Sequence, residues 1–131
     1  MSSFISDGYT EVGYIAAFPG VYEPLRFRFR RSLGWENAEA RRAAAALKPR
    51  DAEAHWAKFL KSKLVDWELH DQHDKPVELT EAHILRMNPT LNEAVLAIVM
   101  SIRAPDADPE ATETPTATVP PADAESAAAK N

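Results

Sequence analysis

The stretch LRFRFR, from Leu25 to Arg30, decides the fold because apolar and basic side chains alternate along it. In an extended strand, successive side chains point to opposite faces, so the apolar residues share one face and the arginines share the other. Residues 12–18 are rich in β-branched and aromatic side chains, and Pro19-Gly20 is a strong turn signal. The sequence therefore predicts a two-stranded β-hairpin, whose apolar face must be covered because two strands alone are unstable.

Four helical segments are predicted after the hairpin. They cover residues 37–47, 51–67, 81–87 and 90–102. Asp51 and Thr80 are good N-caps, and Thr90 to Glu93 matches a capping box. The last helix is expected to bury its apolar side chains as far as Ile102. We therefore predict an α+β fold in which an N-terminal two-stranded β-hairpin packs on a small bundle of about four helices, with residues 1–103 as one domain.

The C-terminal segment, residues 104–131, has a different composition. It holds five prolines, six acidic residues, one lysine and no aromatic residue. Such a segment buries too little apolar surface to offset the entropy of ordering, so it is predicted to be a disordered acidic tail. The tail carries the whole net charge of −5, since the body contains 14 basic and 14 acidic residues.

Composition also disfavours several classes of protein. A neutral body argues against a nucleic-acid binder, which usually shows a basic excess. The absence of cysteine excludes disulfides and thiolate chemistry. No apolar run approaches the roughly 20 residues that span a bilayer, and the N-terminus lacks the basic start and apolar core of a signal peptide. We expect neither membrane insertion nor export.

The segment HDQHD, residues 70–74, concentrates the side chains that most often carry chemistry. His70 and His73 have the spacing of two metal ligands, and Asp71 and Asp74 add oxygen ligands. A third ligand in a fixed position is missing, because nothing in the sequence brings His55 or His83 to this loop. No serine–histidine pattern, glycine-rich phosphate loop or pair of buried carboxylates accompanies them. An exposed polar turn at Asp74-Lys75-Pro76 is therefore favoured over a metal site or an acid–base pair, and no catalytic residue and no cofactor is predicted.

Two groups of side chains are candidates for binding a partner. The first is the aromatic and aliphatic stripe of residues 51–67, which exceeds what a small hairpin needs to cover it. Its members are Trp56, Phe59, Leu60 and Trp67. The second is the arginine face of the hairpin, Arg26, Arg28 and Arg30, which suits acidic groups of a partner or of the tail better than nucleic acid, because no aromatic shares that face.

Longer stretches resemble a known family. They are GYIAAFPGVYEPLRFRFR at 13–30 and KLVDWELHDQHDKPVELTEAHILRMNPTLNEAVLAIVM at 63–100, followed by an acidic Pro/Ala tail. Together they resemble the small tail assembly chaperones of long-tailed bacteriophages and prophages. The most family-like run is W-x-L-x-D-x-x-x-K-P-V-x-L-T, carried by Trp67, Leu69, Asp71, Lys75, Pro76, Val77, Leu79 and Thr80.

This resemblance implies a protein that is not an enzyme. Chaperones of this kind are thought to coat the helical tape measure protein, and keep it soluble, until tail tube subunits polymerise around it. The implied partners are the tape measure protein and the tail tube protein, with self-association also compatible, and the implied location is the cytoplasm of the bacterial host. A structural virion component, such as a tail-tube-associated or connector protein, is the alternative. A metalloprotein using residues 70–74 and a regulatory nucleic-acid binder rank below both.

Overall fold

The computed structural model describes residues 9–110 of the protein. Contacts divide the chain into a unit of Asp7–Ala107 and a second unit of Met1–Ser6 with Asp108–Asn131, and the fold concerns the first. The described residues form three strands and four helices, which confirms the α+β class. Their bounds are β1 Glu11–Ile15, β2 Leu25–Phe29, α1 Gly34–Ala45, α2 Pro49–Lys63, β3 Leu64–Trp67, α3 Glu81–Arg86 and α4 Pro89–Val99.

The sheet has three strands rather than the two that the sequence predicts. Its order is β1-β2-β3, and both pairings are antiparallel. The first pairing is the expected hairpin, with Gly13 opposite Phe27 and Ile15 opposite Leu25. The second arises because residues 64–67 leave the helix and pair with β2, so the prediction of a helix through Trp67 is wrong.

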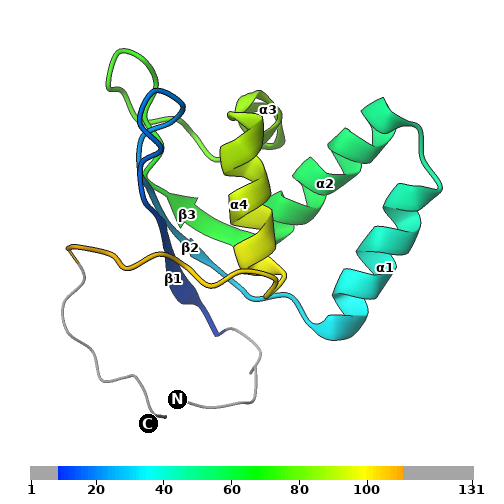
Figure 1. Ribbon diagram of the computed structural model, residues 1–131. Coiled ribbons are helices and arrows are strands. Elements are labelled where there is room, and N and C mark those ends of the chain that lie inside the picture. The colour runs from blue at the N-terminus through cyan, green and yellow to red at the C-terminus, as the bar shows by residue number, and fades with distance from the viewer. Residues whose placement is uncertain (1–8, 111–131) are drawn as a thin grey trace, which may run out of the picture. The chain divides into compact units, whose positions relative to one another are not determined.

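The core lies between one face of this sheet and the helices. Leu25, Phe27 and Phe29 are each at most 1% exposed, as the alternation of LRFRFR predicts. The helices lie on that side of the sheet, and the opposite face is left open (Figure 1). From α4, the residues Leu91, Ala94, Val95, Ile98 and Val99 complete the core. The central strand therefore supplies the surface on which the other elements pack.

The arginines occupy the opposite face of β2, where carboxylates of β3 and of the residue that follows it meet them. Arg26 lies 3.0 Å from Glu68 and Arg28 lies 2.6 Å from Asp66. The hydrogen bond to Asp66, together with its negative charge, raises the pKa of Arg28. The sequence predicts that this face meets acidic groups of a partner or of the tail. In the structure, Asp66 of the third strand and Glu68 after it supply such groups to Arg28 and Arg26.

An irregularity in β3 explains why its sequence reads as helix. Phe27 pairs with Trp67 but Phe29 pairs with Leu64, which leaves Val65 as an extra residue between paired positions. Such a bulge places side chains three residues apart on one face of a sheet. Leu64 and Trp67 thus both turn toward the core, and their spacing imitates a helical stripe.

Several helix ends differ from their predicted positions. The second helix begins at Pro49, which suits a first helical position, so Asp51 lies in the first turn instead of capping it. Thr80 caps α3 as predicted, through a 3.1 Å bond from the His83 amide. Asn88, not Thr90, caps α4. The helix ends at Val99, which leaves Ile102 outside the core and 62% exposed.

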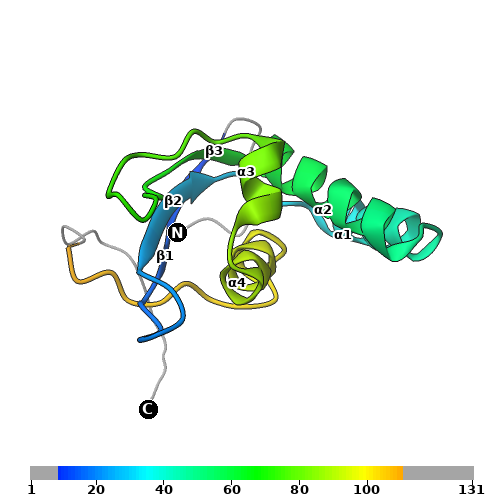
Figure 2. The same cartoon turned by 90° about the horizontal axis from the view of Figure 1, so that it is seen from above.

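The first two helices form a hairpin that extends away from the sheet (Figure 2). Two polar contacts join them: His55 Nε2 bonds the Ala40 carbonyl at 3.0 Å, and Lys63 lies 2.8 Å from Glu36. Ala40 is the one residue of α1 that is buried. This helix is consequently held by its partner helix and by a 3.1 Å hydrogen bond from Asn37 Nδ2 to the Met100 carbonyl, and none of its residues belongs to the apolar core cluster.

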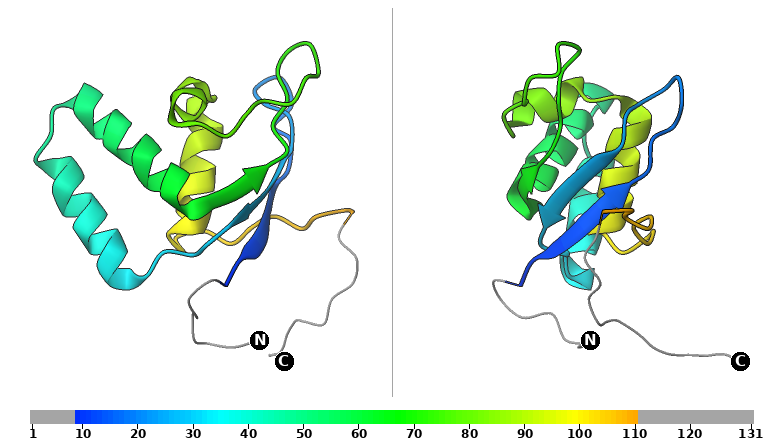
Figure 3. Two further views of the ribbon diagram at one scale, coloured as in Figure 1. Left: turned by 180° about the vertical axis from the view of Figure 1, so that it is seen from behind. Right: turned by 90° about the vertical axis from the view of Figure 1, so that its left-hand side faces the viewer.

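Residues 103–107, here called the strap, run beside the edge strand β1 (Figure 3). The Asp106 amide donates to the Tyr14 carbonyl at 2.8 Å, and its carboxylate accepts from the Ala16 amide at 2.9 Å. Arg103 lies 3.2 Å from the same carboxylate. The start of the predicted tail is therefore attached to the sheet, which corrects the expected boundary at residue 104; residues 111–131 lie outside the described part.

We expect Gly13→Ala to lower the free energy of unfolding by about 1–3 kcal/mol. A methyl group at this position would lie 2.6 Å from Cζ of Phe27, and that ring is only 1% exposed and has little room to move. Urea denaturation measures the change. Gly34→Ala is the control, since nothing lies within 4 Å of a methyl group there, and equal losses in both variants would contradict the close contact.

We expect Asp106→Asn to lower stability by about 1 kcal/mol at neutral pH. The hydrogen bond from Ala16, aided by Arg103, lowers the pKa of Asp106 in the folded protein. The stabilisation is therefore complete above the unfolded pKa of about 4 and is lost as the pH falls through the lower folded value. The free energies of unfolding of the wild type and of Asp106→Asn, measured by urea denaturation, should therefore become equal in acid. A difference in stability that persists at low pH would contradict the assignment of this stabilisation to the ionised Asp106 carboxylate.

Candidate functional site

An apolar groove opens between α2, α3 and the start of α4. It has a volume of about 340 Å³ and is lined by Glu53, Trp56, Ala57, Leu85, Met87, Pro89, Asn92, Glu93 and Leu96. We call it the α2–α4 groove. Leu85 is 50% exposed, and Ala57 and Met87 are nearly buried at 3% and 7%. The groove thus presents apolar side chains to solvent, which is typical of a surface that binds another apolar group.

Trp56 forms one wall of the groove because it stands at the margin of the apolar stripe of α2. Leu60, one turn later, is fully buried. The Trp56 ring packs edge-on against Phe59, with ring centroids 5.6 Å apart, and against His55 at 5.3 Å. These contacts hold a half-buried indole in place while leaving part of it available to a partner.

A rigid elbow between α3 and α4 positions the opposite wall. The Asn88 side chain accepts hydrogen bonds from the amides of Thr90 and Leu91, at 2.9 and 3.3 Å, and donates to the Val21 carbonyl at 3.3 Å. Asn92 donates to the Ile84 carbonyl at 3.0 Å and so ties the two helices together. The groove is therefore largely formed before any partner arrives.

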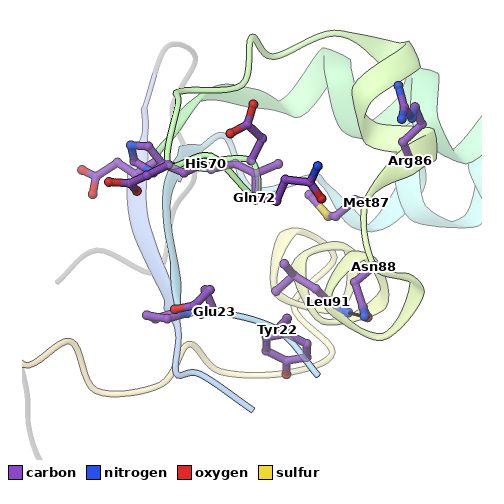
Figure 4. A pocket seen from close by; sticks show the side chains of 13 residues that line it. Tyr22, Glu23, His70, Gln72, Arg86, Met87, Asn88 and Leu91 are labelled. Atoms are coloured by element: carbon purple, nitrogen blue, oxygen red, sulfur yellow. Dashed lines mark hydrogen bonds between the residues drawn. The ribbon is translucent and has the colours of Figure 1, made fainter. Parts of the chain in front are cut away.

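A second cavity of about 700 Å³ lies on the other side of this elbow. Its lining comes from Tyr22–Pro24, from the loop after β3 and from the residues around Arg86 and Leu91 (Figure 4). Met87 lines both concavities. Acidic side chains predominate here, with Glu23, Glu68, Asp71 and Asp74 against the single cation of Arg86.

The loop bordering this cavity is the polar turn that the sequence predicts. The Asp71 carboxylate accepts from the amides of His73 and Lys75, at 2.8 and 3.0 Å. Asp74 has a φ of 60°, a left-handed conformation that aspartate tolerates better than most residues. The turn reading of residues 70–76 is confirmed. Within residues 9–110, no group of three or more His, Asp or Glu side chains is arranged to hold a metal ion.

The structure separates the side chains that the sequence grouped as partner-binding. Trp56 lies in the groove, while Phe59 and Trp67 are partly buried against the core, with Trp67 Nε1 donating to the Val77 carbonyl at 2.7 Å. Leu60 is 0% exposed, so its assignment to a partner surface is wrong: it belongs to the core. Arg26, Arg28 and Arg30 lie on β2 or immediately after it, away from the groove.

Sequence reasoning missed most of the groove. Leu85, Leu96, Glu53 and Glu93 come from three helices, and only the packing of these helices brings them together. One feature of the sequence indicates an exposed apolar residue here. Ile84 and Leu85 are adjacent on a short helix, so they cannot lie on the same face, and if one is buried the other must be exposed.

Comparison with known proteins identifies no relative: no protein-family model, curated protein or solved structure matches this chain. Among the helices of the described residues, none has the length and apolar character needed to cross a membrane.

Leu60→Ala and Trp56→Ala should differ sharply in stability. Truncating the fully buried Leu60 leaves a cavity and is expected to cost about 2–5 kcal/mol. Truncating the half-buried Trp56 removes mainly its contacts with Phe59 and His55, so we expect a loss of about 1 kcal/mol. Thermal and urea unfolding measure both. If Trp56→Ala lowered the free energy of unfolding as much as Leu60→Ala does, Trp56 would be a core residue and would no longer belong to the candidate site.

Proposed function

We propose that this protein is a non-enzymatic tail assembly chaperone of a long-tailed phage or prophage, which binds the tape measure protein and keeps it soluble during tail morphogenesis. The sequence resemblance suggests the family. The observation that carries the proposal is the α2–α4 groove, with its indole wall and its half-exposed Leu85. The protein would act in the cytoplasm of the bacterial host.

The groove suits a helical partner for a physical reason. An amphipathic helix presents apolar side chains at intervals of three and four residues, and such a row fits between the ridges of neighbouring helices. The elbow at Asn88 fixes one wall, so little conformational freedom is lost when a helix docks. A tape measure protein, being long and helical, would offer many such segments to several copies of this chain.

Binding would shield apolar surface that otherwise drives the tape measure protein to aggregate. Tail tube subunits would then displace the chaperone as they polymerise, which requires each contact to be weak. A small groove fits this requirement better than an extensive interface. The tail tube protein is therefore a second proposed partner, encountered when the chaperone is released.

The test is co-expression of the tagged protein with the tape measure protein of the same phage. We expect the two to co-purify and the tape measure protein to remain soluble. Trp56→Ala should reduce both effects at least several-fold, because it removes one wall of the groove. Trp35→Ala is the matched control, since Trp35 is 66% exposed on α1 and lies outside the groove.

Purified virions provide the decisive comparison with the alternative, a structural tail component. A chaperone should be absent or scarce in finished particles when these are measured by mass spectrometry. A stoichiometric amount of the protein in particles, with no effect on tape measure solubility, would overturn the chaperone proposal in favour of the structural one.

A further inference from the structure

The carboxylates of the α2–α4 groove give its rim a definite charge. Glu53 of α2 and Glu93 of α4 both line it, and both are exposed. No lysine, arginine or histidine is among the lining residues. Neither carboxylate forms a hydrogen bond or ion pair within residues 9–110, so both remain available to a ligand.

The acidic character continues past the elbow into the second cavity. Glu68 and Asp71 are already engaged there, by Arg26 and by the turn. Glu23 and Asp74 also line it, and neither has an ion pair among the described residues. The exposed basic residues of the helical hairpin lie outside both linings: they are Arg41, Arg42, Lys48, Arg50, Lys58 and Lys61. The exposed cations of this hairpin therefore do not neutralise the carboxylates of either lining.

We propose that the α2–α4 groove selects a basic amphipathic helix, whose apolar side chains enter between Trp56, Leu85 and Leu96 while lysine or arginine side chains reach Glu53 and Glu93. This inference deepens the proposed function, on which it rests, by stating the chemistry of the partner segment. The argument for this occupant is charge complementarity around an apolar floor. An acidic helix with the same apolar face would meet uncompensated repulsion at both walls.

The carboxylates contribute specificity more than affinity. Exposed ion pairs are individually weak and are screened by salt, whereas burial of apolar side chains in the groove is not. Charge should therefore decide between two partners with the same apolar anchors, and its effect should fade as ionic strength rises. For two rim carboxylates, we expect a preference of about tenfold at low salt.

The experiment uses the full chain and two synthetic helical peptides of about 20 residues, a length that supports a bound helix. Both peptides carry the same leucines at helical spacing; one has lysine at its polar positions and the other has glutamate. Titration calorimetry at low and high salt gives the dissociation constants. We expect the lysine peptide to bind about tenfold more tightly at low salt, with the difference shrinking at high salt.

Variants locate the effect in the groove. Glu53→Lys with Glu93→Lys should reverse the preference, and the milder Glu53→Gln with Glu93→Gln should abolish it. Lys58→Glu with Lys61→Glu is the matched control on another part of α2, and it should leave the preference in place. Because all four side chains are exposed, circular dichroism should show these variants folded.

The acidic residues after position 103 are a competing target for a basic peptide. Binding to them would be insensitive to Trp56→Ala and to the Glu53 and Glu93 variants, and that result would overturn the inference. Equal affinity for the two peptides, or no binding of either, would also overturn it. If the peptides bind equally or not at all, but the tape measure protein is still kept soluble and Trp56→Ala abolishes this effect, the proposed function stands and only the inference about a basic helix fails. If the peptide preference follows Glu53 and Glu93 but the tape measure protein is not held, only the proposed function fails.

Discussion

The burial of Phe27 and Phe29 is the constraint on which the rest of the structure depends. These rings lie on one face of the central strand, 5.5 Å apart between centroids, and are almost completely inaccessible to solvent. Because arginines alternate with them, the strand cannot be covered on both faces by apolar elements. The helices must all pack on one side, and the other side must supply carboxylates or water. Gly13 follows from the same constraint, since the Phe27 ring occupies the space that a larger side chain would need.

Much of the fold could be predicted from local patterns, and the failures have physical causes. The alternation of LRFRFR and the cap at Thr80 depend on neighbouring residues alone, so the sequence reveals them. The strand β3 could not be recognised, because its bulge at Val65 gives Leu64 and Trp67 a helical spacing. Its identity depends on pairing with residues about 38 positions earlier, through contacts such as Arg28 with Asp66. Composition likewise could not show that Asp106 fits the edge of β1.

Of the residues that line the candidate site, the sequence allowed only Trp56 to be predicted. Trp56 stands out on a helical stripe, but whether such a residue is core or surface depends on its neighbours in space. Leu60, one turn away on the same stripe, is wholly buried, and the groove's other walls come from α3 and α4. Binding surfaces made where several helices meet leave no contiguous motif. The polar turn at residues 70–76 shows the opposite case: it is conspicuous in sequence, and its aspartate is occupied in shaping the loop.

The strap has a consequence for where this protein can be shortened. The Glu68 amide donates to the Arg26 carbonyl at 2.8 Å, so the backbone groups of Arg26 face β3 and not β1. The backbone groups of Tyr14, which is paired with Arg26, therefore face away from β2, and by the alternation along the strand those of Val12 do too. Asp106 occupies part of that edge. A protein cut after Arg103, where composition changes, would lose this cover and present an open strand to other molecules. Such a fragment would keep every core residue and still tend to aggregate through intermolecular sheets. The strap would thus limit aggregation by covering the edge of β1. The acidic residues that follow it in the sequence would limit aggregation differently, through charge repulsion between molecules.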